Sequence, residues 1–177
     1  MVKKSSSIWK NTKMTVRKLT MIAMVVALCS TIRISFSYLP NVTPITTIYL
    51  LICLNFGLSE AIIIADMTII VTSLYLGMGY WVPGQLLAYS LIIFLYWLVM
   101  RIDFFERLVM QGILAFVLGL IYGIVISAFM SFVLKISSFE IYYLAGLPFD
   151  LMHGIENFLF MLLIFRPAQL LKKRLLN

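Results

Sequence analysis

The chain has 177 residues and a formal net charge of +7, and 63% of its side chains are hydrophobic whereas only 12% are charged. Soluble domains carry about 25% charged residues, and a domain of this length leaves roughly a third of its unfolded surface exposed to water. A soluble fold therefore cannot hide this much apolar surface. We expect a single all-α domain within a lipid bilayer, with no room for a separate soluble enzyme.

Positive charge is concentrated near the two ends of the chain, where ten of the fourteen Lys and Arg residues lie. Short basic segments beside apolar spans are typical of topology signals and of contacts with anionic lipid headgroups. We therefore expect this charge to contact membrane lipids and not nucleic acid. The ten residues are Lys3, Lys4, Lys10, Lys13, Arg17, Lys18, Arg166, Lys172, Lys173 and Arg174.

Apolar segments, taken in chain order, predict six transmembrane helices. A helix needs about 20 apolar residues to cross a hydrocarbon core of roughly 30 Å. The block at 45–76 is too long for one helix, so we expect a hairpin that turns at Gly57, with Ser59 capping its second helix. The expected spans are residues 19–39, the two halves of 45–76, 85–100, 108–134 and 145–165.

Charge also predicts the orientation of the membrane domain, residues 19–166, between basic tails at 1–18 and 167–177. If both tails are cytoplasmic, the inner face holds twelve basic residues, whereas the outer face holds only Arg33 and Lys135. Such an excess of inner positive charge is the usual rule for membrane proteins. We therefore expect an even number of spans with both termini in the cytoplasm.

Ionisable side chains at membrane depth are costly and usually mark functional sites. Arg33 either pairs with Asp66 or extends to the outer headgroups. In the last span, Asp150, His153 and Asn157 follow the i, i+3, i+7 spacing of one helix face, and Glu156 lies one position away from it. Two structural roles compete with ligand contact. Asp150 caps the helix start, or His153 and Asn157 hydrogen-bond to neighbouring helices.

Two loops on the expected outer side add to these groups. The loop at 77–84 places Tyr80 and Trp81 beside a flexible backbone, and Gln85 follows at a helix start. Asn41 and Thr43 lie in the other loop, between two prolines. Aromatic area combined with a few polar tips is typical of small-molecule sites, although Tyr and Trp are also common in the aromatic belts of membrane interfaces. We expect a pocket at the outward ends of spans one, four and six.

Several enzyme signatures are missing from the sequence. There is no phosphate-binding loop of the Gly-x-x-x-x-Gly-Lys-Ser/Thr type and no His-Glu-x-x-His motif. Ser127 lacks the Gly-x-Ser-Gly setting of rhomboid proteases. Cys29 and Cys53 have no ligand-spaced partners. We therefore expect no enzyme activity, no metal and no cofactor in this chain.

Four short patterns resemble the substrate-binding S components of energy-coupling-factor (ECF) vitamin transporters, and the likeness extends over the whole chain. The first span contains an Ala-x-x-x-Ala pair, Ala23 and Ala27. The first loop reads Asn-Val-Thr-Pro from Asn41. The segment 77–85 reads Gly-x-Gly-x-Trp-x-Pro-x-Gln, and the last span opens with Pro-Phe-Asp, His and Asn at 148–157.

The resemblance implies a six-helix S-component bundle in a bacterial plasma membrane that captures a vitamin at the outer face. Ala23 and Ala27 would dock on a shared transmembrane ECF subunit, and two cytoplasmic ATPases would supply the energy. The ligand patterns look closest to the branch for cobalamin or a precursor, with riboflavin, pantothenate, folate or a queuosine precursor as alternatives. An intramembrane enzyme and a structural subunit also stay open. Expected ligand contacts are Arg33, Asn41, Thr43, Tyr80, Trp81, Gln85, Asp150, His153 and Asn157.

Overall fold

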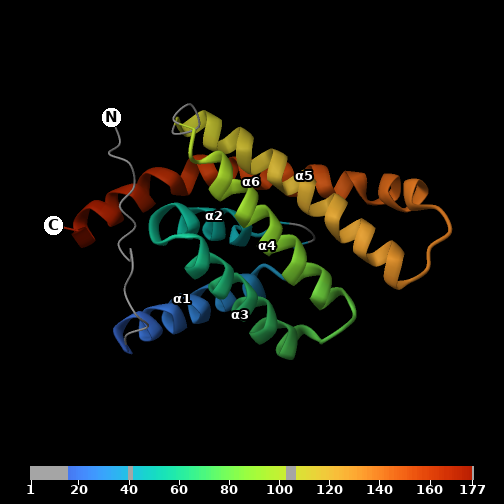
Figure 1. Ribbon diagram of the computed structural model, residues 1–177, viewed down its shortest axis with the longest axis horizontal. Coiled ribbons are helices and arrows are strands. Elements are labelled where there is room, and N and C mark those ends of the chain that lie inside the picture. The colour runs from blue at the N-terminus through green and yellow to red at the C-terminus, as the bar shows by residue number, and fades with distance from the viewer. Residues whose placement is uncertain (1–15, 40–41, 103–106, 177) are drawn as a thin grey trace.

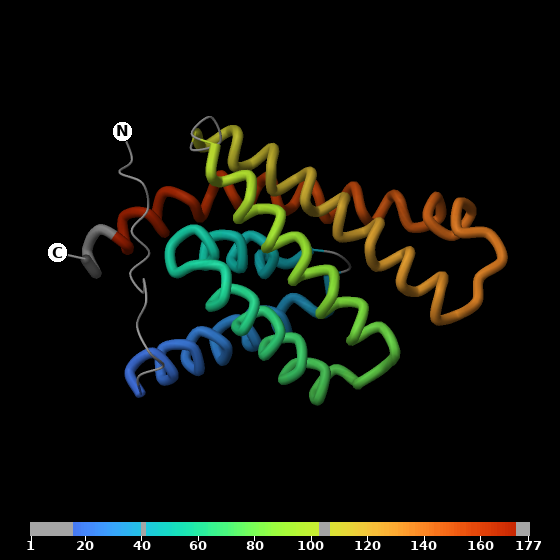
Figure 2. The backbone as a smooth tube through the Cα atoms, in the orientation of Figure 1, coloured from blue at the N-terminus to red at the C-terminus, as the bar shows by residue number. Residues whose placement is uncertain are grey.

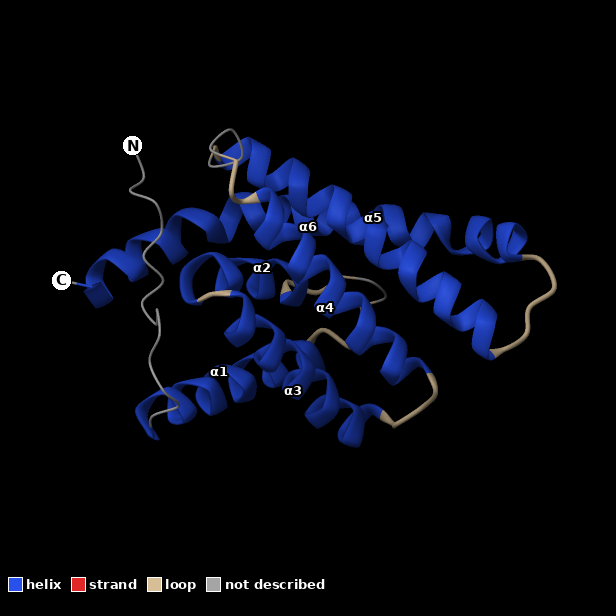
Figure 3. Ribbon diagram, viewed as in Figure 1, coloured by secondary structure: helices blue, strands red, loops and turns tan. Residues whose placement is uncertain are grey.

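The computed structural model describes residues 16–39, 42–102 and 107–176, and side chains through residue 172. The described chain is helical and contains no strand (Figures 1 and 3). Five of its helices are long and apolar enough to cross a membrane. The expected all-α, multi-pass membrane fold is therefore confirmed. The helices are α1 (Val16–Ser35), α2 (Ile45–Phe56), α3 (Leu58–Leu76), α4 (Trp81–Val99), α5 (Leu108–Val133) and α6 (Phe139–Leu176).

The second helix is too short to cross a membrane by itself. Its 12 residues extend over about 18 Å, whereas the hydrocarbon core is roughly 30 Å thick. Most of its side chains are buried, and it contacts each of the other five helices. Helix α2 is thus the central helix of the bundle, and its first residues are buried by the rest of the protein.

The helix ends are sorted between two ends of the molecule (Figure 2). The start of α1, the α2–α3 turn, and the last turns of α4 and α6 lie at one end, which we call the basic end. The α3–α4 and α5–α6 loops lie at the other, which we call the loop end. Basic residues on or beside the helix ends at the basic end are Arg17, Lys18, Arg101, Arg107, Arg166 and Lys172.

The expected break at Gly57 is confirmed. Gly57 has a φ of +119°, a conformation that glycine adopts without the steric cost of a side chain. Its N–H donates a hydrogen bond of 3.1 Å to the Cys53 carbonyl. Gly57 also occupies the N-cap position of α3, and no side chain caps that helix. The expectation that Ser59 caps it was wrong, because α3 already begins at Leu58.

Three helix starts lie earlier than the sequence pattern predicts, and the first of them is α1, which begins at Val16 and ends at Ser35 instead of spanning residues 19–39. Helix α4 begins at Trp81 and not at Gln85, since Pro83 falls in the first turn, where its missing N–H leaves no helical bond unmade. Helix α6 begins at Phe139 and continues for 38 residues to Leu176, about 57 Å. Asp150 therefore lies well inside α6, and the alternative that it caps the helix start was wrong.

Helices α5 and α6 form a long antiparallel hairpin that contacts the other helices through α2 and α4. Their backbones approach closely where Gly119 faces Gly154, since a Cβ on Gly119 would lie 3.0 Å from the Gly154 Cα. Small residues commonly allow such approaches between membrane helices. On the other side, α1 packs on α3 and α2. A space between these two halves, toward the loop end, holds the site described next.

Candidate ligand-binding cavity

A polar cavity of about 250 Å³ opens between the two halves of the bundle. Every helix except α2 contributes to its lining, and the described residues of the connector between α1 and α2, 36–39 and 42–44, cover part of it. The cavity lies near the loop end, where α1 and α3 finish and α4 starts. Its lining residues are Arg33, Phe36, Ser37, Leu39, Val42, Thr43, Leu76, Gln85, Tyr89, Tyr122, Asp150 and His153.

Arg33 reaches into this cavity from the last turn of α1. Its guanidinium donates one hydrogen bond to the Thr72 hydroxyl on α3 and another, of 2.9 Å, to Gln85 Oε1 on α4. Because a guanidinium has five N–H donors, three remain after these two bonds. Asp66 instead accepts a bond of 3.4 Å from Ser90. The expected pairing of Arg33 with Asp66 was therefore wrong, whereas the alternative, extension to the outer headgroups, stays a prediction.

Asp150 brings a carboxylate to the opposite wall, on α6. Its Oδ2 atom is buried and has no hydrogen-bond partner among the described residues. The carboxylate lies directly over Gly123 of α5, where an added Cβ would be 2.1 Å from the Asp150 Cγ. A glycine at this position thus makes the space for the acid. A buried acceptor without a partner is costly. Asp150 is also part of the cavity lining, so this wall presents a carboxylate to a ligand that donates a hydrogen bond.

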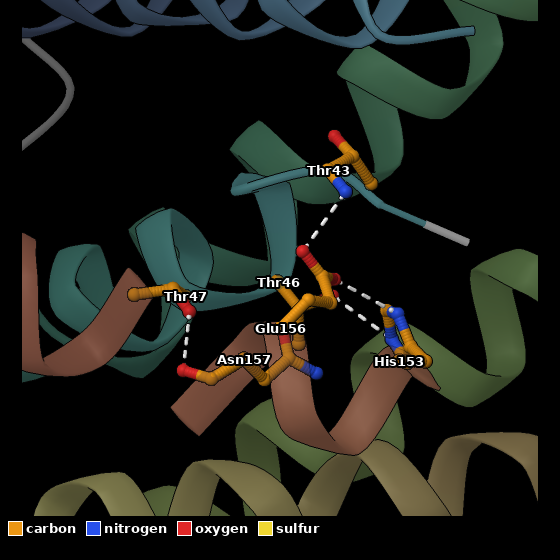
Figure 4. A network of polar contacts seen from close by, with 6 residues as sticks. All are labelled: Thr43, Thr46, Thr47, His153, Glu156 and Asn157. Carbon is orange, nitrogen blue, oxygen red and sulfur yellow. Dashed lines mark hydrogen bonds and ion pairs between the residues drawn. The ribbon is translucent and has the colours of Figure 1, made fainter. Parts of the chain in front are cut away.

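A polar network ties the connector and the start of α2 to α6 (Figure 4). The His153 Nδ1 atom lies 3.0 Å from Glu156 Oε1, and its Nε2 atom lies 3.3 Å from the Thr46 hydroxyl. The other carboxylate oxygen of Glu156 accepts a bond of 2.9 Å from the backbone N–H of Thr43. Glu156 therefore orients the His153 ring and holds the connector at the edge of the cavity.

Asn157 shares the helix face of Asp150 and His153 but lies outside the cavity lining. Its side chain is fully buried, and its amide lies 2.8 Å from the position of a Cβ on Gly119. The backbone carbonyl of Asn157 accepts a bond of 3.2 Å from the Thr47 hydroxyl (Figure 4). The residue thus packs between α6, α5 and α2.

An aromatic series runs along one side of the cavity. Ring centroids lie 5.3 Å apart for Tyr49 and Tyr89, 4.7 Å for Tyr89 and Tyr122, and 5.2 Å for Tyr122 and His153. Neither Tyr89 nor Tyr122 was among the ligand contacts predicted from the sequence. Tyr89 follows Gln85 by one helical turn, a spacing that could have identified it. Tyr122 had no such signal, because its position depends on how α5 crosses α4.

Tyr80 and Trp81, expected in a binding loop, lie outside the cavity lining. Both side chains are exposed, and their rings meet edge to face at 5.5 Å. The Trp81 ring covers Gly79, where a Cβ would lie 2.3 Å from it. This placement follows from the early start of α4, which turns Trp81 back over the loop.

The expected docking pair, Ala23 and Ala27, is exposed on α1. Thr20 and Thr31 follow the same helical spacing, and their hydroxyls bond to the carbonyls of Val16 and Ala27 within the helix. These hydroxyls are thus satisfied within the helix. Thr20, Ala23, Ala27 and Thr31 together form a strip of small side chains along α1. It is accessible to a neighbouring helix.

The cavity thus gathers five of the expected ligand contacts, namely Arg33, Thr43, Gln85, Asp150 and His153. Asn41 lies outside the described residues. Among those residues, no group of three or more His, Cys, Asp and Glu side chains is arranged to hold a metal ion. No family model matches the chain, and neither a curated protein nor a solved structure matches it.

Proposed function

We propose that this chain is the substrate-capture subunit, or S component, of an ECF-type importer and binds a vitamin or related micronutrient at the outer face of a bacterial plasma membrane. The observation that carries the proposal is the cavity between the two halves of the bundle. Polar and aromatic side chains from four helices, α1, α4, α5 and α6, converge on it in a chain with only 12% charged residues. Such convergence is typical of small-molecule sites.

The distribution of basic residues supports an outward-facing cavity. Positive side chains cluster at the basic end, whereas Lys135 is the single basic residue in the loops of the loop end. Cytoplasmic loops of membrane proteins carry the excess of Lys and Arg. The proposal therefore places the basic end and both termini in the cytoplasm, and the mouth of the cavity outside.

The exposed strip on α1 supports a partner-dependent role. Ala23 and Ala27 leave a surface on which another membrane helix can approach closely. The sequence has no phosphate-binding loop, so the proposal assigns ATP hydrolysis to two partner ATPases and docking to a shared transmembrane subunit. The chain itself contributes capture and release of the ligand.

The volume of the cavity restricts the size of the ligand. Sites for drug-sized molecules have volumes of about 300–1,000 Å³, and this cavity is slightly smaller, at about 250 Å³. That favours a compact micronutrient over cobalamin and over precursors that already carry its large corrin ring. A queuosine precursor fits this size better than folate or riboflavin does, and pantothenate lacks a ring to stack on the tyrosines.

A second candidate function is a hydrolytic enzyme, because Thr46, His153 and Glu156 follow the hydroxyl–imidazole–carboxylate order of activated nucleophiles. The Thr46 side chain is fully buried, however, and is absent from the cavity lining. The receptor proposal expects Thr46→Val to keep ligand uptake. If mass spectrometry finds a ligand chemically altered by the wild-type chain and unaltered by Thr46→Val, the enzyme replaces the receptor.

Uptake in a vitamin auxotroph tests the proposed function directly. Cells that express the chain together with the shared ECF module should take up at least one labelled vitamin above background. A catalytically inactive ATPase partner is the control, since it should abolish uptake without affecting the chain. Background uptake for every vitamin, with the complex assembled, would leave a structural subunit as the better account.

A further inference from the structure

The cavity contains two opposite charges on different walls. Arg33 lies on the wall formed by α1, α3 and α4, and Asp150 lies on the wall formed by α5 and α6. The ion pairs within the described chain are Lys18 with Glu60 and His153 with Glu156, so neither cavity charge is neutralised by a partner there. Charges at membrane depth are costly when they are unpaired.

We propose, building on the capture function above, that the ligand is a compact planar heteroaromatic molecule with a cationic or N–H donor at one end and a hydrogen-bond acceptor at the other. Its donor binds the carboxylate of Asp150, which is part of the cavity lining. Its acceptor binds the free N–H groups of Arg33. A ligand of this polarity compensates both charges at once.

The aromatic side of the cavity explains why a planar ring is expected. Tyr89, Tyr122 and His153 form a continuous series of rings, and each of them lines the cavity. Aromatic rings prefer offset-stacked or edge-to-face contacts, which add about 0.5–1.5 kcal/mol per pair beyond area burial. A flat heterocycle between the two charges can make these contacts, whereas a flexible acyclic chain cannot.

The charged residues around the cavity also restrict the net charge of the ligand. His153 already pairs with Glu156, so this imidazole is not a free cation for an acidic ligand. Arg33 is therefore the single guanidinium in the lining, and Asp150 offsets it. A net neutral or cationic ligand suits this balance, and a strongly anionic one such as folate does not.

The first test compares thermal unfolding of the purified full-length chain with five compounds. Thiamine and 7-aminomethyl-7-deazaguanine represent the inferred class, whereas pantothenate, folate and cobalamin represent an acyclic anion, a large anion and a corrinoid. The inference expects the largest rise in melting temperature from one of the first two. A largest rise from one of the other three overturns the inference and leaves the capture function standing. No rise with any compound counts against both.

The second test uses matched ligands, so it does not depend on a variant that folds. 7-Aminomethyl-7-deazaguanine and its 7-cyano analogue differ only in the cationic group, and thiamine and oxythiamine differ in a ring amino group. The pair that binds the wild-type chain more tightly is the one compared. Within that pair, the compound with the amino group should bind about tenfold more strongly than its analogue, which is the range of a charge-assisted hydrogen bond. Equal affinities within the pair would overturn the assignment of Asp150.

Two single-residue variants then test whether Asp150 causes the preference within the pair. Asp150→Asn should reduce the preference within the pair to about threefold or less, because an amide cannot form the same charge-assisted bond. Tyr80→Ala is the matched control, since Tyr80 is exposed and lies outside the lining, and should keep the preference. A preference that persists in Asp150→Asn, or that disappears in Tyr80→Ala, contradicts the proposed site.

Discussion

At the residue scale, the chemistry of the cavity depends on a few side chains that the sequence places far apart. Arg33 and Gln85 are 52 positions apart yet share a hydrogen bond, and Thr43 and Glu156 are 113 positions apart. Single residues therefore join segments that local pattern cannot connect. Glu156 is the clearest example, since its two carboxylate oxygens serve the His153 ring and the connector before α2.

Replacing Glu156 by Ala removes both of these acceptors. The His153 Nδ1–H and the Thr43 N–H then lack partners in a buried setting, and each unsatisfied group costs about 1–3 kcal/mol. We expect a clear fall in the melting temperature of the purified protein. Glu140→Ala is the control, because Glu140 is exposed in the first turn of α6, and it should cost only a few tenths of a kcal/mol. Equal losses for the two variants would contradict the role of Glu156.

Gly123→Ala tests the wall that holds Asp150. The new Cβ would lie about 2.1 Å from the Asp150 Cγ, so the carboxylate or the helix must move, at a cost of about 1–3 kcal/mol. Gly146→Ala on α6 is the matched control, since its nearest neighbour would be the Ser127 hydroxyl at 4.0 Å. That change should stabilise the helix by up to about 1 kcal/mol. Differential scanning fluorimetry should therefore show a lower melting temperature for Gly123→Ala and an equal or higher one for Gly146→Ala. A rise in melting temperature for Gly123→Ala would contradict the packing described.

Individual residues were only partly predictable from the sequence. The helical spacing of Asp150 and His153 correctly placed them on one face. Spacing did not reveal the inward turn of Arg33, because its partners Thr72 and Gln85 come from helices whose packing no local pattern specifies. The aromatic loop was misleading for the opposite reason. Tyr80 and Trp81 have the composition of a binding loop, but the early start of α4 directs them away from the cavity.

At the scale of elements, the short helix α2 separates this fold from a simple row of six spans. The sequence predicted its end correctly, since Gly57 breaks the apolar block. Its buried start was less evident, because an apolar run looks alike whether lipid or protein surrounds it. Thr46 and Thr47, both fully buried, are the signal in hindsight, as polar side chains in a lipid-exposed first turn would have had no partners.

The prediction for a single element concerns docking through the exposed face of helix α1. Ala23→Leu and Ala27→Leu should each weaken assembly with the shared transmembrane subunit, because a larger side chain prevents close approach of a second helix. Ligand binding should be unchanged, since neither alanine lines the cavity. Met24→Leu is the control, as Met24 is also exposed on α1. Co-purification measures the effect, and full recovery of the complex with both alanine variants would remove this docking role.

At the scale of the whole molecule, composition and the spacing of the apolar blocks predicted the all-helical membrane fold. A chain with 63% hydrophobic side chains needs lipid as its solvent, and the apolar blocks gave the correct number of helices. The sequence predicted a pocket between spans one, four and six, but it could not predict the contribution of α5 or the shape of the cavity. Both depend on how the α5–α6 hairpin crosses the other helices and on glycine contacts such as Gly119 with Gly154.

Capture from outside requires that the cavity open on the outer face of the membrane, and labelling of two engineered cysteines tests this most directly. The native Cys29 and Cys53 are buried and should react slowly. Ser37 lies at the cavity, and Ser59 lies at the basic end beside the α2–α3 turn; both are exposed. In intact cells, a membrane-impermeant maleimide should label Ser37→Cys and should label Ser59→Cys only after permeabilisation. The reverse pattern would contradict the proposed orientation and, with it, capture from outside.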